Sequence, residues 1–144
     1  MAAPRTLTRS RARRGAVQAL YQWQLGGDST ENIRGQFRER SGMEKVDWSY
    51  FDQLVEGVAG HHGELDELLS PLLDRTLNEL DPVEKSILRL AAFELRHCES
   101  VPWRVCINEA VELARTFGAQ DSHRYINGVL DPLAKQLRPG CGTS

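Results

Sequence analysis

Residues 81–98 read DPVEKSILRLAAFELRHC and carry the clearest helix signal in the chain. Asp81 is a favourable N-cap residue, Pro82 suits the first helical position, and Glu84 stands where a capping-box acid is expected. Apolar side chains then recur every three or four residues, which places them on one face of a helix. They are Val83, Ile87, Leu90, Ala91 and Leu95. The stretch therefore predicts an amphipathic helix with one buried face.

The same signals continue toward the C-terminus. Val101 and Pro102 open a second helix, for which Gly118 is expected as the C′ residue. Asp121 is expected to cap the last helix, and Pro132 predicts a kink within it. Beyond this helix, residues 139–144 are expected to form a disordered tail.

The N-terminal half has the helical period as well. A helix is predicted over residues 9–25, a shorter one begins near Ser29, Asp47 caps a third, and Pro71 predicts a break. No stretch has the period of two that a strand requires. The sequence therefore predicts an all-α, single-domain helical bundle of six to seven helices over residues 9–138.

Composition places the chain among ordinary globular proteins. It has 144 residues, of which 40% are hydrophobic and 26% charged, enough for one domain with its own core. The three cysteines, Cys98, Cys106 and Cys141, have no paired spacing and indicate reduced thiols in the cytoplasm. No apolar run approaches the roughly 20 residues that span a bilayer, so we expect no membrane association.

Charge is distributed unevenly along the chain. Residues 1–27 contain five arginines and no acid, although the net charge is −2. These arginines are Arg5, Arg9, Arg11, Arg13 and Arg14. Residues 1–8 are expected to form a flexible basic arm, and the arginines that follow would oppose the macrodipole at the start of a helix. Such charges suit a phosphate backbone; the alternative is a solvated, frayed terminus.

Three aromatic residues fall outside the apolar faces of their helices. Tyr21 lies on the same side of its helix as Arg14, and Tyr125 lies about 100° from the apolar face of the last helix. An aromatic ring near basic residues can stack on an unpaired base, although burial at a helix–helix contact is the alternative. Phe93 would mark a protein-docking patch if exposed, or a broad core face if buried.

No catalytic, metal or cofactor site is predicted. Asp121, Ser122 and His123 are consecutive, and neighbouring residues on a helix do not face one another, so they cannot form a triad. Cys98 and Cys106, with the nearby histidine, lack metal-ligand spacing. No phosphate-binding or dinucleotide-binding glycine motif occurs. We therefore expect a protein that is not an enzyme.

Several stretches occur together in a specific order. They are RARRGAVQALYQW at 11–23, VEK at 83–85, LR at 88–89, EL at 94–95, VP at 101–102, INEA at 107–110, ELA at 112–114, FGA at 117–119, DSH at 121–123 and NGVLD at 127–131. This order resembles the NusB family of transcription antitermination factors. The resemblance covers residues 9–138 and is loose over 28–80. Pro132 departs from the family pattern.

The resemblance implies an all-helical fold of two packed sub-bundles. It also implies binding of single-stranded boxA-like RNA in ribosomal RNA leaders. The partners would be the small-subunit ribosomal protein NusE and the antitermination complex on RNA polymerase. Together with Tyr21, the implied RNA-binding residues are Arg9, Arg11, Arg13, Arg14, Phe117, Asp121 and Tyr125. The implied partner-binding residues are Glu84, Arg89 and Phe93.

Other functions remain open at this level. One is a helical protein–protein adaptor that does not bind RNA directly. Another is the RNA-binding domain of a ribosomal RNA methyltransferase, which could not act alone because no glycine-rich cofactor domain follows. The resemblance also leaves open whether the chain is a monomer or a homodimer.

Overall fold

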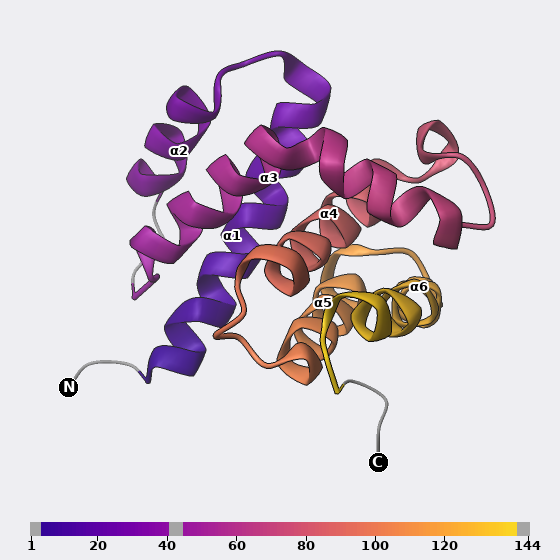
Figure 1. The fold of residues 1–144 in the computed structure, drawn as a ribbon. Coiled ribbons are helices and arrows are strands. Elements are labelled where there is room, and N and C mark those ends of the chain that lie inside the picture. The colour runs from indigo at the N-terminus through magenta and orange to yellow at the C-terminus, as the bar shows by residue number, and fades with distance from the viewer. Residues whose placement is uncertain (1–3, 41–44, 141–144) are drawn as a thin grey trace. The chain divides into compact units, whose positions relative to one another are not determined.

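The computed structural model describes residues 4–40 and 45–140, and every regular element in these ranges is helical. The α-helices are α1 (Arg5–Gly26), α2 (Thr30–Glu39), α3 (Trp48–Leu69), α4 (Pro82–His97), α5 (Trp103–Phe117) and α6 (Ser122–Leu137) (Figure 1). Two 3₁₀ turns, η1 (Ser70–Leu72) and η2 (Leu77–Glu79), link α3 to α4. The prediction of an all-α bundle is confirmed. The chain forms two compact units, residues 1–60 and 61–144, with the boundary inside α3.

In the first unit, α1 and α2 pack against each other. The predicted alanine-rich face of α1 is confirmed, because Ala12, Ala16 and Ala19 are fully buried. Small side chains there let a neighbouring helix approach closely. The first helix begins at Arg5 rather than at the predicted Arg9. Arg5 and the three residues after it are thus helical and not part of a flexible arm.

Local caps set the starts of α2 and α3. Ser29 Oγ accepts a hydrogen bond from the backbone N–H of Asn32 at 3.1 Å, and Asp47 Oδ1 accepts one from Tyr50 at 3.0 Å. Each bond satisfies an N–H that the helix itself leaves unpaired. Both predicted starts are confirmed.

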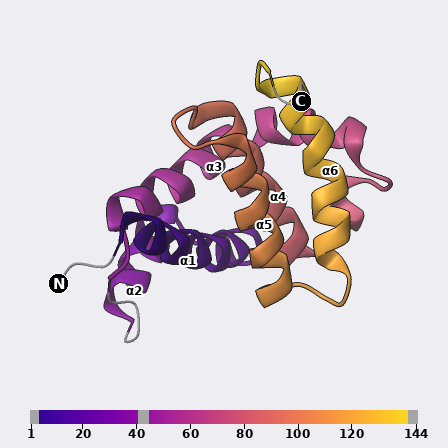
Figure 2. The same ribbon diagram turned by 90° about the horizontal axis from the view of Figure 1, so that it is seen from below.

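In the second unit, α4, α5 and α6 pack against one another. Figure 2 shows α5 and α6 running antiparallel, joined by the short link at residues 118–121. Asp81 caps α4 as predicted, with Oδ1 accepting from Val83 N–H at 2.8 Å. The predicted break near Pro71 is also present, because α3 ends at Leu69 and a 3₁₀ turn follows.

Two features of the α5–α6 link differ from their predictions. Gly118 has φ −86°, so it does not adopt the left-handed conformation expected of a C′ glycine. A glycine is required here because there is no room for a side chain: a Cβ would lie 2.7 Å from Ala114 O and 2.9 Å from Ser122 Cβ. Asp121 does precede α6, but with φ 66° and no capping hydrogen bond from its side chain. The predicted side-chain cap is therefore wrong.

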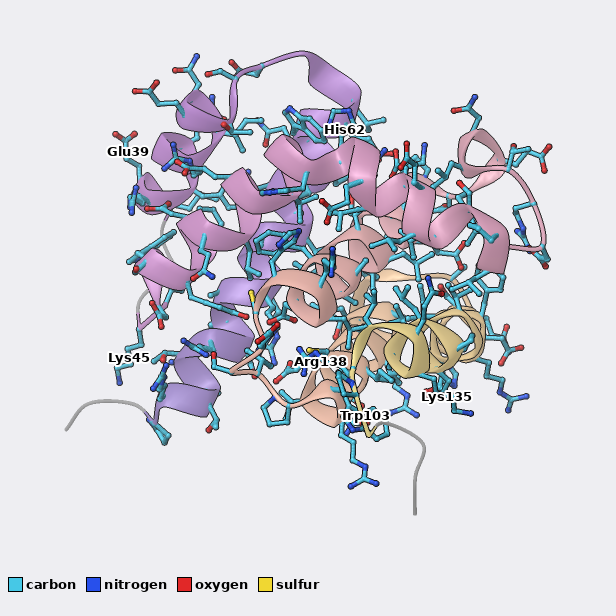
Figure 3. The ribbon with its side chains drawn as sticks, viewed as in Figure 1. Glu39, Lys45, His62, Trp103, Lys135 and Arg138 are labelled. Atoms are coloured by element: carbon cyan, nitrogen blue, oxygen red, sulfur yellow. The ribbon has the colours of Figure 1, made fainter. Side chains whose placement is uncertain are left out.

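The end of the described chain is tied to α4. The helix α6 continues through Pro132 to Leu137, so the proline does not end it. Arg138, whose side chain is labelled in Figure 3, then donates hydrogen bonds at 2.8–3.1 Å to the backbone carbonyls of Glu94, Leu95, Cys98 and Val101. A cation at a helix C-terminus satisfies carbonyls that have no helical partner. The remainder of the predicted tail, with Cys141, lies outside the described residues apart from Pro139 and Gly140.

Candidate nucleic-acid interface

Arg9 and Arg13 lie on the flank of α1 that meets Tyr50 in the same unit. Their guanidinium carbons are 4.2 and 5.4 Å from the centroid of the Tyr50 ring, within cation–π range. Arg9 Nε also lies 3.8 Å from Asp47 Oδ2. Arg13 is only 2% exposed, so its prediction as an RNA contact is corrected: the side chain is part of the core. Arg9 is a partly covered cation with a protein partner.

Other arginines of α1 reach solvent. Arg14 and Arg5 are exposed, and Arg11 is half-exposed, with Nη1 3.4 Å from the carbonyl oxygen of Lys45. Tyr21 is 39% exposed and lies on the side of Arg14. We refer to Arg5, Arg11 and Arg14 as the accessible arginines. They can approach a phosphate backbone without disturbing the core.

Because α1 begins at Arg5, the arginine that opposes the helix macrodipole is a different one from those predicted. The first turn holds no acid, and Pro4 provides no side-chain cap. The macrodipole acts mainly within the first turn of a helix. Arg5 therefore opposes it, whereas Arg9 and the arginines that follow lie too far along the helix to do so.

Tyr125, a predicted RNA-binding residue of the second unit, is less exposed to solvent than Arg5 and Arg14 of α1. Tyr125 is half-buried, with the Arg75 guanidinium carbon 4.9 Å from its ring centroid. Burial raises the pKa of the Tyr125 hydroxyl, and the nearby Asp74 backbone partly opposes this shift. The Arg75 side chain, hydrogen-bonded to the Asp74 carboxylate at 2.7 and 3.1 Å, lowers the pKa of that carboxyl. One face of Tyr125 is thus already covered by a cation.

The other two predicted residues flank the α5–α6 link. Phe117 is half-buried at the end of α5, and Asp121 is exposed with Oδ1 3.8 Å from Arg124 Nε. The Asp121 carboxylate is therefore accessible and partly neutralised by a neighbouring arginine. This lowers the repulsion that an isolated carboxylate would exert on RNA phosphates.

The predicted partner-binding residues are engaged within the second unit. Glu84 accepts a hydrogen bond from Ser122 Oγ at 2.6 Å. Arg89 forms a bidentate ion pair with Asp66, both contacts being 2.8 Å. Phe93 is 5% exposed, which agrees with the alternative of a broad core face and not with an exposed docking residue, as the resemblance had implied.

A polar hollow of about 580 Å³ lies beside α5 and α6. It is lined by Asn108, Val111, Glu112, Arg115, His123, Arg124 and Asn127. We call it the α5–α6 hollow. Four of these residues, Asn108, Glu112, His123 and Asn127, lie in stretches that carry the family resemblance, and the sequence predicted a binding role for none of the seven. The spacing of Asn108, Glu112 and Arg115 at i, i+4 and i+7 places them on one helix face and could have indicated it.

Ser122 and His123 lie at the start of α6, directly after Asp121. Ser122 Oγ donates to Glu84 and not to His123. No group of three or more histidine, cysteine, aspartate or glutamate side chains is placed to hold a metal ion in residues 4–40 and 45–140. Over the same residues, no helix is both long and apolar enough to cross a membrane.

These features define a class: a small all-α protein with accessible arginines on its first helix and a polar hollow beside its last two. The model of the NusB family matches residues 10–135. The chain therefore belongs to the NusB family. It is 53% identical over 131 residues to the transcription antitermination protein NusB of Idiomarina loihiensis, covering 91% of this chain and 94% of that protein. Its identity to the Alcanivorax borkumensis protein of the same name is 55% over 130 residues, covering 90% and 87%.

Solved structures share the fold. The T. maritima NusB structure superposes with a TM-score of 0.81 at 28% identity, covering 96% of both chains. A crystal structure of the antitermination factors NusB and NusE in complex with double-stranded RNA gives a TM-score of 0.77 at 24% identity, covering 90% of this chain and 98% of that chain. At this lower identity the likeness is one of fold.

Proposed function

We propose that this chain is a transcription antitermination factor that binds single-stranded boxA-like RNA of ribosomal RNA leaders. In this role it acts with the ribosomal protein NusE, within the antitermination complex on RNA polymerase. The observation that carries the proposal is the 53–55% identity to transcription antitermination proteins over 90–91% of the chain. The role is one of binding and assembly rather than catalysis.

The surface of α1 supports direct contact with RNA. Arg11 and Arg14 are accessible and lie on the side of Tyr21, the exposed aromatic of the same helix. Single-stranded RNA is commonly held by cations along its backbone and by aromatic rings that stack on its bases. Arg5, Arg11 and Arg14 supply the cations, and Tyr21 supplies a ring.

A titration with labelled boxA RNA tests the proposal, with a scrambled RNA of the same composition as the control. Each RNA is measured with and without NusE at two salt concentrations. We expect preference for boxA RNA, weaker binding at the higher salt, and tighter binding when NusE is present. Equal affinity for both RNAs would contradict specific recognition. Binding of NusE without any RNA binding would indicate a protein–protein adaptor instead.

A further inference from the structure

The α5–α6 hollow gathers polar side chains that packing does not require. Asn108, Glu112 and Asn127 are exposed and His123 is half-exposed, whereas their neighbours Ile107, Ala110, Leu113 and Val129 are buried. The four polar residues come from stretches that carry the family resemblance. The core explains the apolar residues of those stretches but not the polar ones.

Charges in the hollow are paired. Arg115 Nη1 lies 2.6 Å from Glu112 Oε1, and Arg124 Nε lies 3.8 Å from Asp121 Oδ1. Paired charges attract a phosphate less than free arginines do, since each positive charge is offset nearby. The hollow therefore differs from the accessible arginines and is poorly suited to hold a phosphate backbone by charge alone.

The asparagine amides of the hollow can both donate and accept hydrogen bonds. Among the described residues, the side chains of Asn108 and His123 have no hydrogen-bond partner, and Asn127 has one long contact of 3.4 Å to Asp131. Asparagine amides match the paired donor and acceptor on a base edge. A volume of about 580 Å³ lies in the range of sites that enclose small organic groups.

A protein side chain fits the hollow less well. Protein hot spots are aromatic or apolar anchors in desolvated pockets, and Val111 is the one aliphatic residue in the lining. A base displays a planar edge of donors and acceptors, which a polar lining can match without an apolar anchor.

We propose that the α5–α6 hollow binds unpaired bases of the RNA and reads their edges through Asn108 and Asn127. This inference rests on the proposed function, because it assigns a second, base-reading site for the same RNA. The accessible arginines supply affinity for any RNA, and the hollow supplies preference for one sequence.

The test compares boxA and scrambled RNA by fluorescence anisotropy on the full chain, with and without NusE. The variants are N108A/N127A and the near-isosteric, uncharged N108L/N127L, with Asn78→Ala, an exposed asparagine outside the hollow, as the matched control. Loss of one paired base contact is worth about tenfold in discrimination. Each double variant removes two base-reading amides, so we expect both to lose at least about tenfold of the boxA preference, while affinity for scrambled RNA changes less than twofold. The control is expected to keep the preference.

Each outcome is decisive. A boxA preference that is unchanged in both double variants overturns the inference and leaves the proposed function intact. Loss of NusE cooperativity with an unchanged preference also overturns it, in favour of a protein in the hollow. A wild-type chain that binds no RNA contradicts the proposed function and the inference together. Thermal melts monitored by circular dichroism show which variant remains folded, and the near-isosteric variant decides if the alanine variant unfolds.

Discussion

The start of α1 and the α5–α6 hollow hold their arginines in different ways. On α1, the accessible arginines Arg5 and Arg14 project into solvent, whereas Arg13 is buried beside Tyr50. In the hollow, by contrast, Arg115 lies against a carboxylate. The comparison teaches that the number of arginines in a sequence does not give the number available to a ligand.

If the proposed function holds, the two regions should contribute differently to RNA binding, one to affinity and the other to sequence preference. Unpaired surface cations bind any phosphate backbone and lose affinity as salt rises. Amides and paired charges respond to hydrogen-bond patterns, which differ between bases. We therefore expect changes on α1 to alter affinity and changes in the hollow to alter sequence preference.

The largest expected effect follows from reversing charge on α1. R11E/R14E should weaken binding to boxA and scrambled RNA alike by about 100-fold, since two charge-assisted contacts are worth roughly 3 kcal/mol. R104E/K135E, which changes two exposed cations of the second unit, is the charge-matched control and should change affinity far less. Anisotropy titration measures both. Equal losses in the two variants would mean that net charge, and not the position on α1, governs binding.

A second prediction concerns the geometry of the α5–α6 link. Gly118→Ala should destabilise the fold by about 2 kcal/mol, because the new Cβ would overlap Ala114 O and Ser122. Gly128→Ala is the control: a Cβ there meets nothing within 4 Å, and alanine should stabilise the helix by up to about 1 kcal/mol. Urea unfolding measures both free energies. Equal stability of the two variants would contradict the close approach at Gly118.

A smaller effect is expected at the exposed aromatic of α1. Tyr21→Ala should weaken RNA binding by about fivefold, which corresponds to the lower end of the energy of stacking one base. Tyr21→Phe keeps the ring and should bind like the wild type. Anisotropy titration compares the two variants. If the phenylalanine variant loses as much affinity as the alanine variant, the hydroxyl and not the ring makes the contact.

The smallest effect concerns pH and the buried hydroxyl of Tyr125. Burial raises the pKa of Tyr125 in the folded state above its usual value near 10. Folding therefore favours the neutral form of the Tyr125 hydroxyl. The stability that this preference contributes is fully present below about pH 10 and is lost as pH rises through the folded-state pKa. The unfolding free energy of wild type relative to Tyr125→Phe should be constant from pH 8 to 10 and fall above that. Parallel curves across the whole range would contradict the shift.

The sequence predicts the helices well where the deciding contacts are local. Ser29, Asp47 and Asp81 each cap a helix by accepting from an N–H two or three residues away. Such bonds depend on adjacent residues only, so the order of residue types is sufficient to find them.

The sequence fails where the deciding contact is distant. The sequence predicted a disordered tail directly after Arg138 and gave that side chain no contact, yet its hydrogen-bond acceptors lie 37–44 residues earlier in the chain. Arg13 was predicted as a surface cation because nothing local shows that Tyr50 approaches it. Gly118 was expected to need a positive φ, but the requirement comes from Ser122 across the link. For the predicted RNA-binding residues, the residue types follow from the sequence, but only the fold decides which of these side chains are accessible.

The central claim is that the accessible arginines of α1 contact RNA, whereas the buried Arg13 does not. The salt dependence of RNA binding tests this claim most directly. Each contact with a single-stranded phosphate contributes about −0.7 to the slope of log K against log salt. For wild type against R11A/R14A, we predict that the slope becomes less steep by about 1.4. For Arg13→Met, which removes a buried cation, we predict the wild-type slope. An unchanged slope in R11A/R14A, or an equal loss of slope in the Arg13 variant, would contradict the account.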